Sequence, residues 1–161
     1  MGRTRSKKFY LENEALELGF GTYTMLMYYA LTLNSVKGKK LFDATMTEWA
    51  YRVNYDLDLT GITSSDIGAH FVISDIQDAI SFIDGDLINA LESEKEDLLT
   101  KYGGKSNFEE NVNSNEGIIG FVGVADEYYI DDPESLIGIA EMLKDFLQVA
   151  VNLNKSYNVI P

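Results

Sequence analysis

The chain of 161 residues contains no cysteine, and it has one histidine, one tryptophan and two prolines. Without cysteine it cannot form disulfide bonds, thiolate metal sites or a thiol nucleophile. Any triad or histidine-rich metal site would have to be built on His70. Its neighbours Ile67 and Phe71 are apolar, so we expect a packed or half-exposed side chain and not a catalytic base. The sequence predicts no catalytic residue, and therefore a protein that is not an enzyme.

Basic side chains are also scarce, since 13 Lys and Arg stand against 26 Asp and Glu, for a formal net charge of −13. Arg3, Arg5, Lys7 and Lys8 lie at the very start, so the rest of the chain is more acidic still. An acidic body repels the phosphate backbone, so we expect no nucleic-acid binding by the folded part. Its charge suits a basic protein partner, although solubility alone explains the same composition.

Long apolar runs are absent as well. No run approaches the ~18 residues that span a bilayer, so we expect no membrane partner. The basic start resembles the beginning of a signal peptide, but Glu12, Glu14 and Glu17 interrupt the apolar stretch that should follow. We therefore expect a cytoplasmic protein, with residues 1–8 as a basic flexible tail and residues 9–161 as a single acidic globular domain.

Hydrophobic residues make up 45% of the chain, which is typical of a folded domain. Their spacing predicts a mainly α domain with a minor β component, an α+β fold. Alternation around Asn13 predicts a short N-terminal β-hairpin within residues 9–20. The spacing predicts helices over 23–35, from Met46 to Leu57, around Ile67 to Phe71, from Ile76 towards Gly103, and from Pro133 onward.

Local signals bound these helices. Thr22 is a predicted N-cap, and Thr45 and Ser74 each open a predicted capping box. Glycine and cations at Lys37–Lys40 predict the end of the first helix. Asn, Gly and Ser dominate residues 103–116, which predicts a loop. The predicted core consists of Leu26, Leu33, Trp49, Val53, Ile76, Ile80, Ile83, Leu87, Leu143 and Leu147.

The stretch Asp56-Leu57-Asp58-Leu59-Thr60-Gly61 matches the first half of a calcium-binding loop. In such a loop, oxygens at alternate positions surround the ion and glycine makes the turn. The twelfth position should be a bidentate glutamate and is Ile67. A capped turn between helices explains the same residues, so we expect no metal and no cofactor.

Tyrosine is abundant, with ten residues. Tyr23, Tyr28 and Tyr29 crowd one predicted helix, and Tyr128 and Tyr129 precede the last one. Tyrosine is enriched at protein interfaces because it combines a large apolar area with a polar tip. These five residues are the predicted partner-binding residues, and a core with tyrosine at its rim is the alternative.

Residues 8–91 carry an ordered pattern that resembles a known family. The order is a predicted hairpin, Gly19-Phe20-Gly21 with a helix from Leu26 to Leu33, the pair Trp49-Ala50, the stretch Thr63–Gly68, and an isoleucine-rich helix from Ile76 to Leu91. This order is similar to that of the tail assembly chaperones of long-tailed bacteriophages. The resemblance implies a non-enzymatic protein of the infected bacterial cytoplasm that holds tail-tube or tape-measure protein before assembly.

A second class of function fits the same composition. A small acidic inhibitor, such as an immunity or anti-defence protein, occupies a basic groove of a nuclease. The two classes share size, acidity and lack of cysteine. An inhibitor should gather its carboxylates on one face, whereas a chaperone should expose an apolar groove. The sequence leaves the oligomeric state open, a homo-oligomer included.

Overall fold

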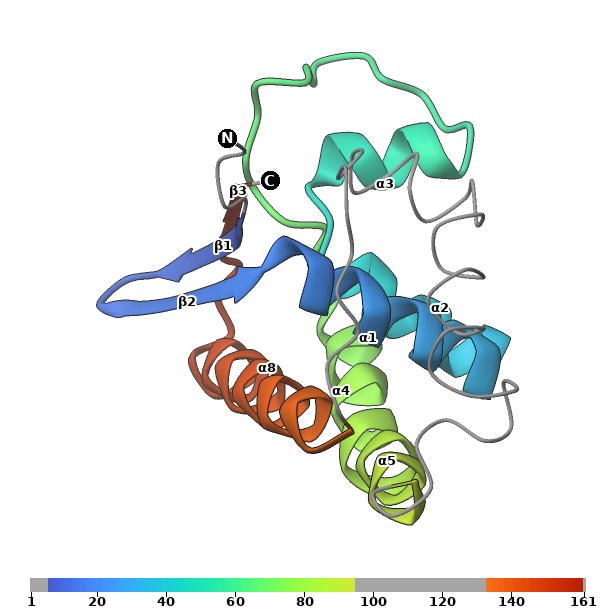
Figure 1. Cartoon of the computed structure of the whole chain (residues 1–161). Coiled ribbons are helices and arrows are strands. Elements are labelled where there is room, and N and C mark those ends of the chain that lie inside the picture. Colours follow the sequence, from blue (N-terminus) through green and yellow to red (C-terminus); the bar gives the residue numbers. More distant parts are fainter. Residues whose placement is uncertain (1–5, 95–132, 161) are drawn as a thin grey trace, which may run out of the picture.

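The computed structural model describes residues 6–94 and 133–160, which form a helical body with a small sheet on one side (Figure 1). The elements are β1 (Ser6–Leu11), β2 (Glu14–Gly19), α1 (Phe20–Leu33), α2 (Ser35–Ala44), α3 (Glu48–Asn54), α4 (Ile73–Phe82), the π-helix η1 (Ile83–Leu87), α5 (Ile88–Ser93), α8 (Pro133–Leu153) and β3 (Asn158–Ile160). The predicted mainly α fold with an N-terminal hairpin is confirmed. Residues 6–8, expected in the basic tail, belong to β1, and the loop predicted over 103–116 lies outside the described residues.

The sheet has the strand order β2-β1-β3 and is antiparallel throughout. Phe9 in β1 is paired with Leu16 on one side and Val159 on the other. These three side chains are buried, while Tyr10 on the opposite face is 40% exposed, as the two-residue period of a strand requires. β3 was not predicted, because three residues are too short to show a period and only pairing with β1 defines the strand.

α1 runs through the centre of the body, and every residue from 23 to 30 is buried. α2 packs against α1 and α4, while α8 packs against α4, α5 and β2. α8 contributes the buried stripe Leu136, Ala140, Leu143 and Leu147, which confirms the helix predicted from Pro133. No described helix is long and apolar enough to cross a membrane.

The prediction that Lys37–Lys40 ends the first helix is wrong. α1 ends at Leu33, and Asn34 caps a second helix with its side-chain oxygen. That oxygen accepts hydrogen bonds from the backbone amides of Val36 and Lys37, at 3.1 and 2.9 Å. Lys37–Lys40 therefore lies inside α2, and its glycine serves close packing instead of helix termination.

The three residues predicted as N-caps do not occupy the N-cap positions of the helices. Thr47, not Thr45, caps α3, because its hydroxyl oxygen accepts from the amide of Ala50 at 3.1 Å. Thr45 follows the end of α2 and is fully buried. α1 and α4 begin before Thr22 and Ser74, so both residues lie within the first turn. Packing against the body, and not a side-chain cap, determines where these two helices begin.

The predicted core is largely confirmed. Six of its members are buried, namely Leu26, Ile76, Ile83, Leu87, Leu143 and Leu147. Leu33 and Ile80 are partly buried against that core. The prediction is wrong for Val53, which is 42% exposed, and Trp49 is only half-buried. Both lie on α3, which contains no buried residue, so their apolar spacing has no partner in the helical body.

Lys7 is a charged side chain on the core side of β1, and it is only 5% exposed. Its Nζ lies 4.9 Å from the centre of the Tyr23 ring, a cation–π distance. Burial lowers the pKa of Lys7 from 10.5 to about 8, because desolvation disfavours the ammonium form. Burial also raises the pKa of the Tyr23 and Tyr157 hydroxyls above the usual value.

Gly38 should not tolerate a side chain. A Cβ at this position would overlap the backbone carbonyl of Ala30 in α1, which cannot move aside as a flexible side chain can. We expect Gly38→Ala to destabilise the protein by about 1–3 kcal/mol through overpacking. Gly138→Ala in α8 is the control, because nothing lies within 4 Å of its added Cβ. Urea denaturation measures both variants, and equal free energies of unfolding would contradict the close packing of α1 on α2.

Lys7 should make stability rise with pH. Its folded-state pKa is depressed, so its contribution to stability is complete above 10.5 and is lost as the pH falls through about 8. Tyr23 and Tyr157 have raised folded-state pKa values, so they lower the free energy of unfolding as the pH rises above their unfolded pKa of 10.0. We therefore expect the free energy of unfolding to rise from about pH 8 to about pH 10. Lys7→Met should abolish this rise and stabilise the protein by about 1–3 kcal/mol at pH 7. An unchanged pH profile in the variant would contradict the assignment to Lys7.

Candidate functional site

The segment Glu48–Gly68 leaves the helical body and returns to it, and we call it the arm (Figure 1). It consists of α3 and the long loop that follows. Its two ends meet beside the β-bridge between Thr47 and Ala69, where the Glu48 amide donates to the Gly68 carbonyl at 2.8 Å.

The prediction of a helix over Ile67–Phe71 is wrong. The chain is extended there, where the arm returns to the body. Gly68 forms a bridge with Asn158 of β3, and the Ala69 amide donates to the Tyr157 carbonyl at 2.9 Å. The chain is extended here because it lies along the outer edge of β3. A short apolar run is compatible with a buried helix or a strand, and only the partner strand decides between them.

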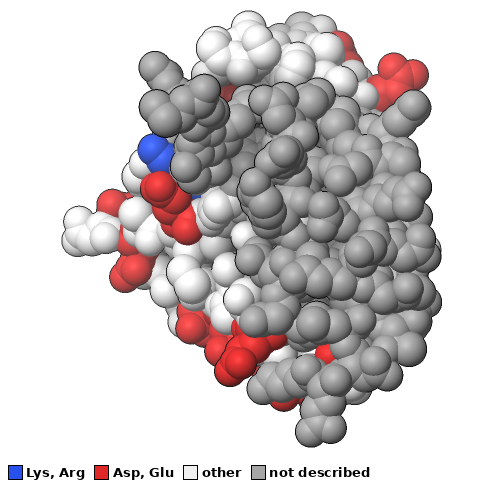
Figure 2. Space-filling model, in the orientation of Figure 1, with Lys and Arg blue, Asp and Glu red and all other residues white. Residues whose placement is uncertain are grey.

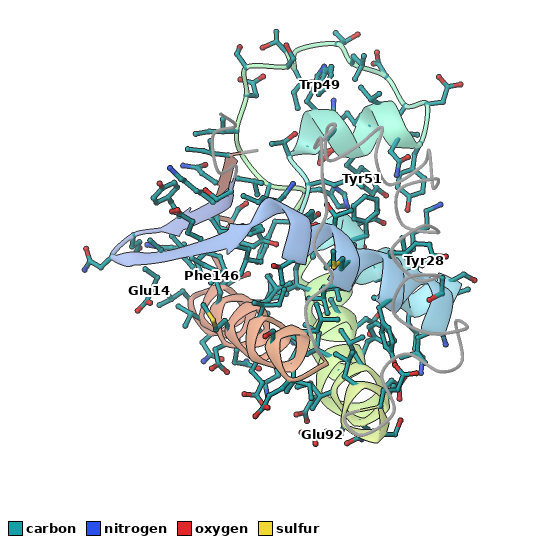
Figure 3. The ribbon with its side chains drawn as sticks, in the orientation of Figure 1. Glu14, Tyr28, Trp49, Tyr51, Glu92 and Phe146 are labelled. Carbon is teal, nitrogen blue, oxygen red and sulfur yellow. The ribbon has the colours of Figure 1, made fainter. Side chains whose placement is uncertain are left out.

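The inner side of the arm is fastened by a stacked pair of rings. Tyr51 of α3 lies parallel to His70, with ring centres 3.4 Å apart and planes at 5°. His70 Nδ1 lies 2.9 Å from a carboxylate oxygen of Glu48, whose other oxygen accepts from Arg52 Nε at 3.1 Å. His70 is buried, so the prediction of a packed side chain is confirmed. Figure 3 shows Tyr51 on the side of α3 that faces the body and Trp49 on the opposite side.

A second contact joins the end of α3 to α2. The Tyr55 hydroxyl donates to Asp43 Oδ2 at 2.6 Å, and Lys39 Nζ lies 4.5 Å from the centre of the Tyr55 ring. Burial raises the pKa of both Asp43 and Tyr55. Enzymes use such groups for proton transfer. Here Asp43 and Tyr55 are bonded to each other and His70 is covered by a ring, so this cluster anchors the arm.

The tip of the arm, residues 56–66, is held in place by hydrogen bonds from its own side chains. Asp58 Oδ1 accepts from the amide and the hydroxyl of Thr60, at 3.0 and 2.7 Å, and these bonds lower the pKa of Asp58. Asp66 Oδ2 accepts from the Thr63 amide at 2.8 Å. Gly61 has φ +81°, the left-handed conformation that glycine adopts without strain. A loop ordered before binding loses little entropy when a partner docks.

These contacts also account for the calcium-like motif. The Asp58 carboxylate serves as a hydrogen-bond acceptor for the loop itself, as expected for a capped turn. Within residues 6–94 and 133–160, no cluster of three or more His, Asp or Glu side chains is arranged to hold a metal ion.

The outer side of the arm and its return carry uncovered apolar side chains. Most of the strongly exposed large apolar residues in the described part of the chain lie between residues 53 and 73, with exposures from 36% to 48%. They are Val53, Leu57, Leu59, Ile67, Val72 and Ile73. We call these six residues the apolar set. Clustered apolar exposure on a folded protein marks interaction surfaces.

The charge within the arm is mainly of one sign. Between Arg52 and Lys95 the sequence contains no lysine or arginine, while Asp56, Asp58 and Asp66 lie in the arm. Arg52 itself is engaged by Glu48 at the base. In Figure 2 the upper edge, where the arm lies, shows white and red side chains and no blue ones. The arm is therefore both apolar and acidic.

The tyrosines predicted to bind a partner are placed elsewhere. Tyr23 and Tyr29 in α1 are fully buried, and Tyr28 is 9% exposed. Their side chains belong to the core, which corrects the expectation of an exposed tyrosine surface on this helix. Tyr128 and Tyr129 lie outside the described residues. Helical spacing alone did not distinguish a central helix, which is buried on all sides, from a surface helix.

The apolar set was not predicted as a site. The available signal was the pair Leu57 and Leu59 between aspartates in a stretch with calcium-loop spacing. Leucine between loop carboxylates has no role in holding an ion, and the structure places both leucines at the surface.

A hollow of about 380 Å³ lies between α2 and the α4–η1 segment. Lys37 and Lys40 line it together with Asp78 and Asp86. Lys37 pairs with Asp86 at 3.3 Å and Lys40 with Asp78 at 2.7 Å. These pairs neutralise one another, so the hollow presents no charge that would select a ligand.

The inner and outer sides of the arm should differ in their effect on stability. Tyr51→Ala removes the ring that stacks on His70, and we expect a loss of about 1–3 kcal/mol. Leu57→Ser and Leu59→Ser alter exposed side chains, so stability should stay within about 0.5 kcal/mol of the parent chain. Urea denaturation checks all three variants. A loss for Leu57→Ser as large as that for Tyr51→Ala would show that the tip is packed and not available to a partner.

Comparison with known proteins does not add a relative to this picture. No family model, curated protein or solved structure matches the chain.

Proposed function

We propose that this chain is a non-enzymatic protein-binding module and that the arm is its docking surface. The observation that carries the proposal is the apolar set, of which Val53, Leu57, Leu59 and Ile67 are exposed on the arm, whose helix α3 contains no buried residue. Apolar side chains that neither stabilise the fold nor lie singly on the surface are typical of protein interfaces.

The construction of the arm supports this function. The stacked Tyr51–His70 pair holds the inner side, and side-chain hydrogen bonds hold the tip. A partner therefore meets a surface that is already shaped, and binding needs little additional ordering. Trp49 is half-buried on the side of α3 away from the body (Figure 3). Tryptophan at such a position is a frequent binding hot spot.

For the partner, our lead proposal is an unassembled phage tail protein. The ordered pattern in residues 8–91 resembles the tail assembly chaperones, and this resemblance implies tail-tube or tape-measure protein. Exposed Leu57 and Leu59 support the proposal, because a subunit held before assembly still exposes the apolar surface that it buries later. The contact would then be mainly apolar, and its affinity would resist salt.

The acidity of the arm favours a second candidate. Asp56, Asp58 and Asp66 lie in the arm, whose single lysine or arginine, Arg52, is paired with Glu48. An acidic inhibitor would use these carboxylates to enter a basic groove of a nuclease. Association with such a target would slow strongly as salt rises, because screening acts over about 8 Å at physiological ionic strength.

Site-specific photo-crosslinking in the native cells tests the docking surface. A photoreactive amino acid replaces Leu57 in the arm, and a matched variant replaces Met142 in α8, since each side chain is 48% exposed. We expect a discrete protein adduct from position 57 and none from position 142, because only the arm contacts the partner.

Mass spectrometry of the adduct then separates the candidates. A tail-tube or tape-measure protein supports the chaperone, and a nuclease supports the inhibitor. No adduct from position 57, or the same adduct from both positions, contradicts the arm as the docking surface.

A further inference from the structure

We infer that the arm recognises a basic amphipathic α-helix, a partner segment with an apolar stripe flanked by lysine or arginine. This inference rests on the proposed docking function and gives its partner a chemistry. Three features of the arm lead to it: the use of its backbone groups, the sign of its charge and the position of its leucines.

The backbone of the tip is already hydrogen-bonded. The Leu57 amide donates to the Arg52 carbonyl at 2.8 Å, and the Ile62 amide donates to the Leu59 carbonyl at 3.2 Å. The Arg52 guanidinium also donates to the Asp58 carbonyl at 3.3 Å. A partner strand needs a row of free backbone groups. The bonded groups of the tip are not available to a partner strand, which favours recognition through side chains, as when an amphipathic helix lies on an apolar surface.

The charge of the arm excludes a second copy of this chain as the natural occupant. A symmetric contact between two arms would place Asp56, Asp58 and Asp66 of one copy against the same residues of the other. Like charges brought together in an interface are strongly unfavourable. Arg52, the one lysine or arginine within the arm, is bonded to Glu48. A partner with lysine or arginine beside its apolar contacts removes the conflict.

The arrangement of side chains in the tip matches one face of a helix. Leu57 and Leu59 are 48% and 40% exposed, and Asp56 and Asp58 flank Leu57 in the chain. An amphipathic helix carries its apolar residues in a stripe with charges along both borders. Leucines in the stripe and cations at its borders would therefore meet the leucines and aspartates of the tip at the same time.

Peptide binding to the purified full chain tests the inference, with Trp49 as the intrinsic fluorescent reporter because it is the single tryptophan and lies in α3. The probes are three synthetic peptides of about 18 residues without tryptophan. One places Leu and Lys at helical spacing, one has the same composition with the stripe scrambled, and one carries Glu in place of Lys. We expect the first to bind at least about tenfold more tightly than either of the others.

Variants locate the contact. Leu57→Ser should weaken binding of the Leu/Lys helix by about tenfold, since it removes an apolar contact from the tip. Asp56→Asn should weaken it about two- to fivefold at low salt, with little difference at high salt. Asn suits this position because Asp56 has φ 55°, a left-handed conformation that Asn tolerates. Met142→Ser is the control and should leave the affinity unchanged.

Each alternative result overturns the inference. Equal binding of the scrambled peptide would mean that charge alone acts, and equal binding of the Glu peptide would mean that apolar contact alone acts. No binding of the Leu/Lys helix, or equal weakening by Met142→Ser, would remove the arm as a helix-binding surface. If position 57 still cross-links to a protein in cells, the docking function stands and only its helical partner is excluded. If position 57 does not cross-link, the docking function itself fails.

Discussion

The corner between α2 and α3 is the contact on which the rest of the described fold depends. The Tyr23 hydroxyl in α1 lies 2.6 Å from Thr45 Oγ1, and the Tyr157 hydroxyl beside β3 donates to the Ala44 carbonyl. The amide of His70, just after the arm, donates to the Met46 carbonyl at 3.0 Å. Buried polar groups are costly without partners. The corner supplies partners to the central helix, the sheet and the arm together.

This construction separates stability from binding. The core is closed by α1, α2, α4, α5, α8 and the sheet, while α3 contributes no buried residue. The arm is held by Tyr51 and Tyr55, through ring stacking on His70 and a hydrogen bond to Asp43. Its exposed side chains therefore contribute little to the core and are the ones assigned to a partner in the proposed function. Changes there should alter affinity with little effect on the free energy of unfolding.

Under the proposed docking function, the arm would combine two kinds of recognition. Its leucines provide apolar area, which gives affinity without much dependence on salt. Its aspartates give long-range attraction and reject partners of the same sign. Arg52 is the single lysine or arginine of the arm, so the arm's own charge is acidic. The chaperone and inhibitor proposals each emphasise one component, and a basic amphipathic helix would use both.

The sequence by itself determined the features that depend on neighbours along the chain. Periodicity placed the hairpin, the α1 and α8 helices and the buried Ile76, and composition fixed the acidity. Only the tertiary structure decided that Tyr23 is buried while Leu57 is exposed, since burial depends on which elements pack on either side. It also decided that Lys37–Lys40 lies inside α2, because Asn34 caps that helix and Gly38 packs closely against the α1 backbone. The strand β3 forms by pairing with β1, and the extended Ile67–Phe71 segment forms by pairing with β3. Such pairing between distant parts of the sequence leaves no local pattern from which it could be predicted.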